Sequence, residues 1–166
     1  MADTTTAEVP IWGDELQDWM NIGDSTAPNW VNVTNLLSWE FSDDANTYEP
    51  EYIDTKRRPK YTLSKSASID YEKDMYRNNA LDTFLASHED DTNVPVEVCR
   101  VRTWEKATGS SGGLVAKKAA FLLTPNQLDK NTAGEPIKLK GTLSMSDNDW
   151  TQGTWSAGKF TAPASA

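Results

Sequence analysis

The chain has 166 residues, of which 37% are hydrophobic and 25% charged, a composition typical of one ordinary domain. Its single cysteine, Cys99, and its single histidine, His88, exclude a disulfide scaffold and a zinc site made of Cys and His. No stretch approaches the ~18 consecutive apolar residues of a membrane span, and residues 1–10 lack the basic end and apolar run of a signal peptide. We therefore expect a soluble protein without an export signal.

The charge is strongly polarised along the chain. The net charge is −9, yet residues 1–55 hold 12 acids and no lysine or arginine, whereas residues 56–166 hold 13 acids and 16 bases. The only dense basic cluster is KRRPK at 56–60, which is weak evidence for a nucleic-acid site. We expect this cluster to meet acids elsewhere in the chain or on a neighbouring copy.

The chain begins with a segment too aromatic for a plain disordered tail. Residues 1–29 contain Trp12 and Trp19 among acids, threonines and prolines. We interpret the segment as an N-terminal arm whose tryptophans contact a neighbouring subunit. The alternative is that both tryptophans cover the domain's own sheet.

Two alternating segments then flank a long loop. Residues 30–42 and 61–71 place apolar and polar side chains at alternate positions, the period of a half-buried strand. Between them, residues 43–60 show no sustained period but keep aromatic residues, which favours a functional loop. The polar faces of the two strands carry Ser38, Glu40, Ser42, Ser64, Ser66, Ser68 and Asp70.

The rest of the chain predicts one helix and further strands. Leu81, Phe84, Leu85 and His88 share a helical stripe within a helix at about 79–88. Strands are expected at 94–104, 114–124, 137–146 and 153–160, followed by a flexible tail at 161–166. The sequence thus predicts a mainly β domain over 30–160, an antiparallel β-sandwich or barrel with one short α-helix.

No pattern argues for catalysis, a metal or a cofactor. His88 lies on the apolar line of the predicted helix, where capping or packing is the simpler role. The acids of SDNDW at 146–150 lack the glycine position and closing glutamate of a calcium loop. We therefore expect a protein that is not an enzyme and needs no cofactor.

The aromatic content instead favours interfaces between copies. The chain holds seven tryptophans and five tyrosines, several outside the predicted core strands. A charge-polarised chain also suits head-to-tail stacking, in which unlike surfaces meet and the assembly closes into rings or extends as a filament.

The order of these segments resembles the major tail tube proteins of long-tailed, siphovirus-like bacteriophages. The resemblance covers about residues 30–160 and rests on WxxVxxLLSWEF at 30–41, EPEYIDTKRRPKYT at 49–62 and GTLSMSDNDWTQGTW at 141–155. It implies a tail-tube β-sandwich that forms hexameric rings stacked head to tail into the conduit for DNA delivery. It further implies a protein of the virion tail, assembled in the host cytoplasm.

The resemblance also implies partners and site residues. The partners would be other copies, the tape measure protein, the tail terminator and baseplate or tip proteins, with DNA passing through unbound and no membrane. The family's long hairpin loop reaches an adjacent ring, and this role would fall on Tyr48, Glu49, Tyr52, Ile53, Asp54, Arg57 and Arg58. The serine-rich polar faces named above would line the channel, where like charge lets DNA slide.

Two rival functions remain from other classes. A tryptophan-rich, acidic β-sandwich of this size could be a carbohydrate-binding module that stacks sugars on Trp150 and Trp155. The second rival is an enzyme with a carboxylate site, for which the sequence offers no positive feature.

Overall fold

The structure, a computed structural model, describes residues 8–51, 60–108, 112–128, 133–147 and 149–163. These residues form an antiparallel β fold with one α-helix, which confirms the fold class predicted from the sequence. The elements in chain order are a 3-10 turn η1 Gly13–Glu15, β1 Leu16–Asn21, β2 Trp30–Asn32, β3 Leu36–Tyr48, β4 Tyr61–Asp74, α1 Ala80–Ser87, β5 Val94–Lys106, β6 Leu114–Pro125, β7 Lys138–Met145, β8 Thr151–Ser156 and β9 Lys159–Thr161.

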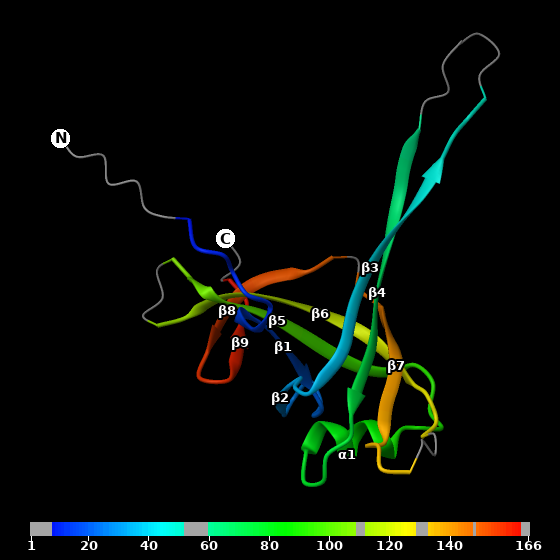
Figure 1. Cartoon of the computed structure of the whole chain (residues 1–166). Helices are drawn as coiled ribbons and strands as arrows, with labels where there is room; N and C mark the ends of the chain where they lie inside the picture. Colours follow the sequence, from blue (N-terminus) through cyan, green and yellow to red (C-terminus); the bar gives the residue numbers. More distant parts are fainter. Residues whose placement is uncertain (1–7, 52–59, 109–111, 129–132, 148, 164–166) are drawn as a thin grey trace.

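The strands form a curled sheet that branches at β6. The main order is β2-β1-β5-β6-β7-β4-β3, with every neighbouring pair antiparallel. The first half of β6, residues 114–118, pairs with β8, whereas its second half, residues 121–125, pairs with β7. Figure 1 shows the resulting arrangement, in which β3, β4 and β7 run steeply across β5 and β6.

The larger core lies between these crossing parts of the sheet. Alternate residues of a strand point to opposite faces, so one face of each strand supplies this core. Its fully buried members include Met20, Ile69, Val98, Phe121 and Leu143.

A smaller core lies on the opposite face of β5 and β6. There Cys99, Val101 and Ala116 pack against Trp155 of β8, and Trp19 of β1 lies with its ring centroid 5.0 Å from that of Trp155. The hairpin of β8 and β9 therefore covers a face that a single sheet would leave open to water.

The helix closes one end of the larger core. Asn79 caps it by accepting hydrogen bonds from the backbone N–H groups of Leu81 and Asp82. Leu81 and Leu85 are buried, and these observations confirm the predicted helix. Lys73 of β4 donates to Asp82, and both side chains are at most 1% exposed, so a buried ion pair joins the helix to the sheet.

The structure corrects four boundaries predicted from the sequence. Residues 16–21 of the predicted arm form β1, which pairs with β5 in the interior of the sheet. The predicted strand at 30–42 is divided into β2 and β3 by a turn in which Asn35 has φ 59°. Residues 43–48 of the predicted loop continue β3 because they pair with β4, and the predicted last strand is the two-stranded hairpin of β8 and β9.

The physical reasons differ between these corrections. Exposed strand residues in a two-stranded ribbon have no core to face, so residues 43–48 lack the apolar alternation that marks a strand in the sequence. The tight turn between β8 and β9 has Ala157 at φ 49° and Gly158 at φ 74°. Of these two residues, only the glycine is a type that predicts such a turn from the sequence.

We expect the buried ion pair to dominate the stability of the helix end. Lys73→Met leaves the Asp82 carboxylate buried without its counter-charge, which typically costs about 3–5 kcal/mol in the free energy of unfolding. Urea denaturation measures this loss. The matched control is Lys65→Met, which removes an exposed pair with Asp43 and should cost less than about 1 kcal/mol. Equal losses in the two variants would contradict this prediction.

We also expect the free energy of unfolding to depend on pH because the thiol of Cys99 is buried. Desolvation raises the pKa of the Cys99 thiol from 9.0 to about 12. The unfolded chain ionises this thiol at lower pH than the folded chain, so its contribution to stability is complete below pH 9 and falls as pH rises toward 12. Thermal melts compared with Cys99→Ala measure the difference, and an identical pH dependence in both proteins would contradict it.

Candidate assembly surfaces

The β3–β4 hairpin extends well beyond the body of the protein. β7 pairs with β4 only from Ser68 to Asp74, so residues 61–67 of β4 pair with β3 alone among the strands of the described residues. The residues from Asp43 to Tyr48 are all exposed, and Figure 1 shows the hairpin rising away from the crossing strands. The β3 strand of this ribbon is therefore open to solvent on both faces from Asp43 to Tyr48.

The projecting hairpin carries ion pairs and exposed aromatic side chains. Lys65 pairs with Asp43 and Lys60 with Glu49, each at 3.0 Å. Tyr48 and Tyr61 are partners across the two strands and are 52% and 50% exposed. Isolated two-stranded hairpins are marginally stable in water at best, so a ribbon of this length favours contact with a further surface.

β3 also leaves one sheet edge open. It pairs with β4 on one side, and its other side carries no strand within the described residues. Unpaired backbone N–H and C=O groups along an edge strand are a template for pairing with another chain.

The predicted channel residues share one face of the sheet. Glu40 lies opposite Asp70, and Ser42 lies opposite Ser68. Asp44 and Asn46 extend the same face along the hairpin, where their partners are Ser66 and Ser64. We call the outward surface of β3, β4 and β7 the polar face; it comprises Ser38, Glu40, Ser42, Ser68, Asp70, Glu72, Lys138, Lys140, Thr142 and Ser144.

Charges on the polar face are partly compensated. Glu72 pairs with Lys138 at 3.2 Å and with Lys140 at 3.3 Å, and the hydrogen bond from Lys138 lowers the pKa of Glu72. Thr142 donates a hydrogen bond of 2.7 Å to Asp70. Glu40 and Asp70, which are like charges on paired strands, leave an exposed anionic centre on this face.

The sequence interpretation missed the contribution of β7 to the polar face. Lys138, Lys140, Thr142 and Ser144 alternate with apolar residues in a strand that the sequence did predict. This alternation shows which residues point outward, but only the pairing of β7 with β4 places them beside Asp70.

The other predicted contact residues have mixed outcomes. Tyr48 and Glu49 lie on the exposed hairpin, whereas Tyr52, Ile53, Asp54, Arg57 and Arg58 lie outside the described residues. Trp12 is 67% exposed. Trp19 is half-buried and packs in the smaller core against Trp155, as the alternative that it covers the domain's own sheet expects, and its contact with another subunit stays a prediction.

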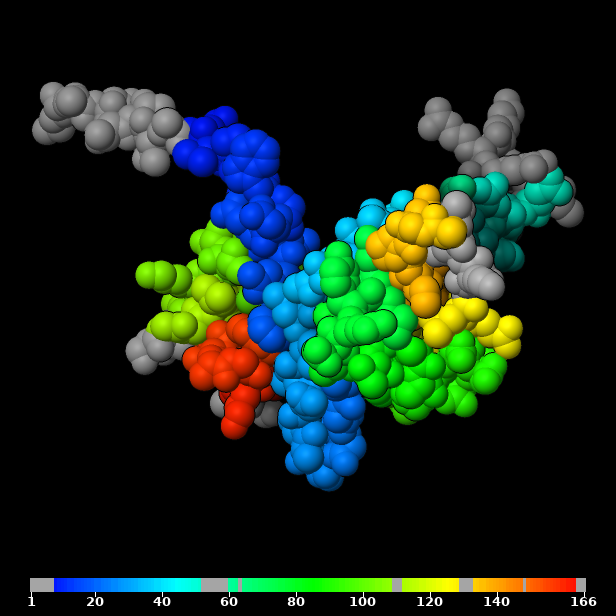
Figure 2. Space-filling model, turned by 60° about the horizontal axis from the view of Figure 1, so that its bottom comes forward, coloured from blue at the N-terminus to red at the C-terminus, as the bar shows by residue number. Residues whose placement is uncertain are grey.

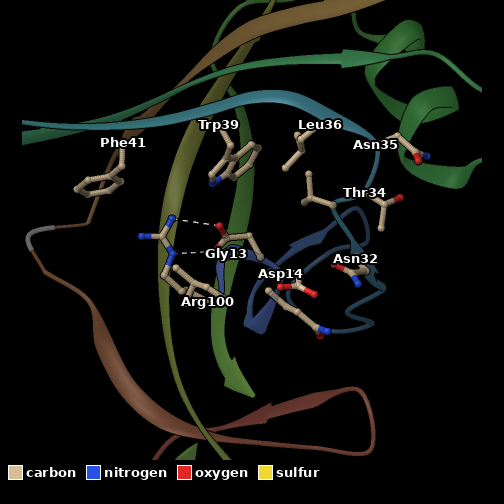
Figure 3. Close-up of a pocket in the computed structure, with 13 residues that line it drawn as sticks. Gly13, Asp14, Asn32, Thr34, Asn35, Leu36, Trp39, Phe41 and Arg100 are labelled. Atoms are coloured by element: carbon tan, nitrogen blue, oxygen red, sulfur yellow. Dashed lines mark hydrogen bonds and ion pairs between the residues drawn. The ribbon is translucent and has the colours of Figure 1, made fainter. Parts of the chain in front are cut away.

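A groove separates β3 from the N-terminal turn. It has a volume of about 740 Å³, and its wall on β3 is formed by Leu36, Trp39 and Phe41. Figure 3 shows Leu36 and Trp39 on one side of this space, with Asp14 and Asn32 on the other. At its floor, Arg100 donates two hydrogen bonds to Asp18, of 2.8 and 3.1 Å.

The described residues show neither a metal site nor a membrane helix. No group of three His, Cys, Asp or Glu side chains in this part of the chain could hold a metal ion. The helix found there is also too short and too polar to cross a membrane.

Chains from solved structures of gene transfer agent particles and of a prophage baseplate have a similar fold. A chain from the tail of an empty gene transfer agent particle, refined with C6 symmetry, matches with a TM-score of 0.55 at 15% identity, over 92% of this chain and 100% of that chain. A chain from the virion of a native gene transfer agent particle matches with a TM-score of 0.54 at 14% identity and the same coverage.

A third structure with this fold comes from an assembly of another kind. A chain from the baseplate of the anti-feeding prophage, symmetrised six-fold, matches with a TM-score of 0.51 at 12% identity, over 88% of this chain and 97% of that chain. No protein-family model matches the sequence, and no curated protein matches it significantly. The similarity at this level of identity is one of fold.

Proposed function

We propose that this protein is a structural subunit of a tail tube, which assembles with copies of itself and performs no catalysis. The observation that carries the proposal is the projecting β3–β4 hairpin, which has the shape and the exposed aromatic residues of a connecting element. The fold shared with chains of tail and baseplate structures supports it.

The assembly that fits is a set of six-membered rings stacked head to tail. Two of the structures with this fold are described as C6 or six-fold symmetrised, which supports six copies in each ring here. The hairpin of each copy would contact the adjacent ring through Tyr48, Tyr61 and the charged residues near its tip. Unlike surfaces then meet at every contact, as head-to-tail stacking requires.

The polar face is the surface that suits a channel for DNA. Its side chains are short or paired, and its exposed anionic centre at Glu40 and Asp70 would repel phosphate groups. A wall of like charge lets the genome slide without holding it.

The cellular context follows from the same proposal. The protein would reside in the tail of a virion or related particle, after assembly in the host cytoplasm. Its partners would be further copies, a tape measure protein inside the tube, and terminator and baseplate or tip proteins at its ends.

The structure does not support the carbohydrate-binding alternative, in which sugars would stack on Trp150 and Trp155. Trp155 is 7% exposed and lies in the smaller core. Trp150 packs on Phe121 and Phe41, with ring centroids at 5.7 and 6.3 Å. Trp155 therefore offers no exposed aromatic face to a sugar ring, and the half-buried ring of Trp150 already carries Lys117 Nζ at 4.4 Å from its centroid.

Shortening the hairpin tests the assembly role. The paired residues Asn46 and Ser64 can be joined by replacing residues 47–63 with the dipeptide Asn-Gly, which forms a two-residue hairpin turn. We expect a folded chain that forms no tubes, because the connecting element is gone. Negative-stain microscopy and sedimentation measure assembly.

Two controls make this experiment decisive. Circular dichroism and thermal melting report whether the shortened chain keeps its fold, since neither core contains Tyr48, Glu49 or Tyr61 of the removed stretch. A second variant replaces residues 49–60 with a Gly/Ser segment of equal length and separates the length of the tip from its chemistry. Tubes of normal length from the shortened chain would refute the connecting role.

Reversing the charge of the polar face tests its place in the channel. We expect Glu40→Lys/Asp70→Lys to assemble but to retain DNA, because two lysines in each copy would attract phosphate at low salt. DNA retention by tubes and the rate of DNA ejection from particles measure this effect. The matched control is Asp91→Lys/Glu105→Lys, which makes the same change in net charge on exposed residues outside the polar face. Equal behaviour of both double variants would place the channel elsewhere.

A further inference from the structure

The N-terminal end of the described chain exposes three large apolar side chains in a short run. Val9, Ile11 and Trp12 are 78%, 57% and 67% exposed, and residues 8–12 have neither helical nor strand structure. Figures 1 and 2 show this segment leading away from the body, on the side opposite to the hairpin. Contiguous apolar residues exposed in this way mark a contact with another surface.

The same molecule offers an apolar groove that remains open. The groove between β3 and the N-terminal turn holds about 740 Å³, a volume within the ~300–1,000 Å³ range of pockets that bind small ligands. Phe41 and Leu16, which line it, are 38% and 37% exposed. Its size and apolar wall suit two or three large side chains.

The groove wall also contains an unpaired hydrogen-bond donor. The indole Nε1 of Trp39 is shielded from solvent and has no acceptor within the described residues. Figure 3 shows Trp39 on the groove wall, above Arg100. A buried N–H without an acceptor is costly, and the carbonyl groups of an extended peptide are suitable acceptors.

The polar groups of the groove are largely paired with one another. Arg100 at its floor is hydrogen-bonded to Asp18, and Asp14 lies at its N-terminal side. Glu8 is the only charged residue in the segment from 8 to 12, so the contact that this segment can make is mainly apolar.

The local geometry directs residues 8–12 away from the groove of their own chain. Gly13 and Asp14 line the groove, so the segment leaves the body at the groove's rim. The turn η1 fixes its direction there, because Trp12 N–H donates to Glu15 Oε2 at 2.7 Å and Glu15 N–H donates to Trp12 O at 3.0 Å. Residues 8–12 would have to reverse at this braced turn to enter their own groove.

We propose that residues 8–12 of one copy dock into the groove of a second copy. Ile11 and Trp12 pack against Trp39 and Phe41, and a main-chain carbonyl of the segment accepts the hydrogen bond of Trp39 Nε1. The proposal rests on the proposed function only in taking a second copy as the partner. It adds a contact that does not involve the β3–β4 hairpin.

A peptide-binding experiment tests the groove directly. The receptor is the full chain carrying Ile11→Ser/Trp12→Ala, so that its own segment does not compete, and the probe is a fluorescein-labelled peptide of residues 1–15. We expect saturable binding by fluorescence anisotropy, which the same peptide without Ile11 and Trp12 does not displace.

Substitutions within the receptor locate the binding site. Phe41→Ser should weaken binding at least tenfold, and Trp39→Phe, which keeps an aromatic ring but removes the donor, about fivefold. The matched control is Leu37→Ser, which removes an apolar side chain that is 54% exposed on the same strand but does not line the groove. Thermal melts confirm that each receptor is folded. No saturable binding, or equal losses with Phe41→Ser and Leu37→Ser, would overturn the proposal.

A photo-crosslinking experiment distinguishes a second copy from the chain's own groove. Benzoylphenylalanine in place of Trp12 should yield a covalent dimer, and mass spectrometry should find the crosslink within residues 34–41 of the second chain. Crosslinks within one chain, or to residues remote from the groove, would overturn the proposal.

Tube assembly separates this proposal from the proposed function. If the native chain forms tubes and the Ile11→Ser/Trp12→Ala chain forms them equally well, the docking contact is wrong and the tube function stands. If the native chain forms no tubes but its groove binds the peptide, the tube function is wrong and the docking contact stands.

Discussion

The pairing of β4 with β7 over only half of its length is the constraint on which the rest of the structure depends. From Ser68 to Asp74, β4 lies between β3 and β7, and Ile69 and Tyr71 are buried in the larger core. Beyond that stretch toward the tip, β3 is its one paired strand among the described residues. One end of β4 is therefore fixed in the body of the protein, and the other end projects with β3 beside it.

The register of this strand also separates the apolar interior from the polar face. Because side chains alternate, burying Ile69 and Tyr71 places Ser68 and Asp70 outside. A slip of one residue would exchange the two sets, so the larger core enforces the polar face. The buried pair of Lys73 and Asp82 then ties this strand to the helix at the base of the hairpin.

The aromatic residues divide between stabilising the fold and offering contacts. Trp19, Trp30 and Trp155 form the smaller core, so much of the aromatic content that suggested interfaces stabilises the subunit itself. Trp12 and the paired tyrosines of the hairpin remain exposed, on segments that leave the body in different directions. A subunit with separate projections of this kind is suited to contacts with more than one neighbour.

The sequence by itself determined the antiparallel β class, the helix at about 79–88 and the polar sides of the two strands that carry Glu40 and Asp70, because helical and strand periodicity are local properties. Only the tertiary structure decided that Trp19 lies in a core and that β7 adds Lys140 and Thr142 to the polar face. Strand order depends on contacts between residues far apart in the chain, which local periodicity does not encode. The length of the hairpin was hidden for a related reason, since a ribbon exposed on both faces carries no apolar alternation.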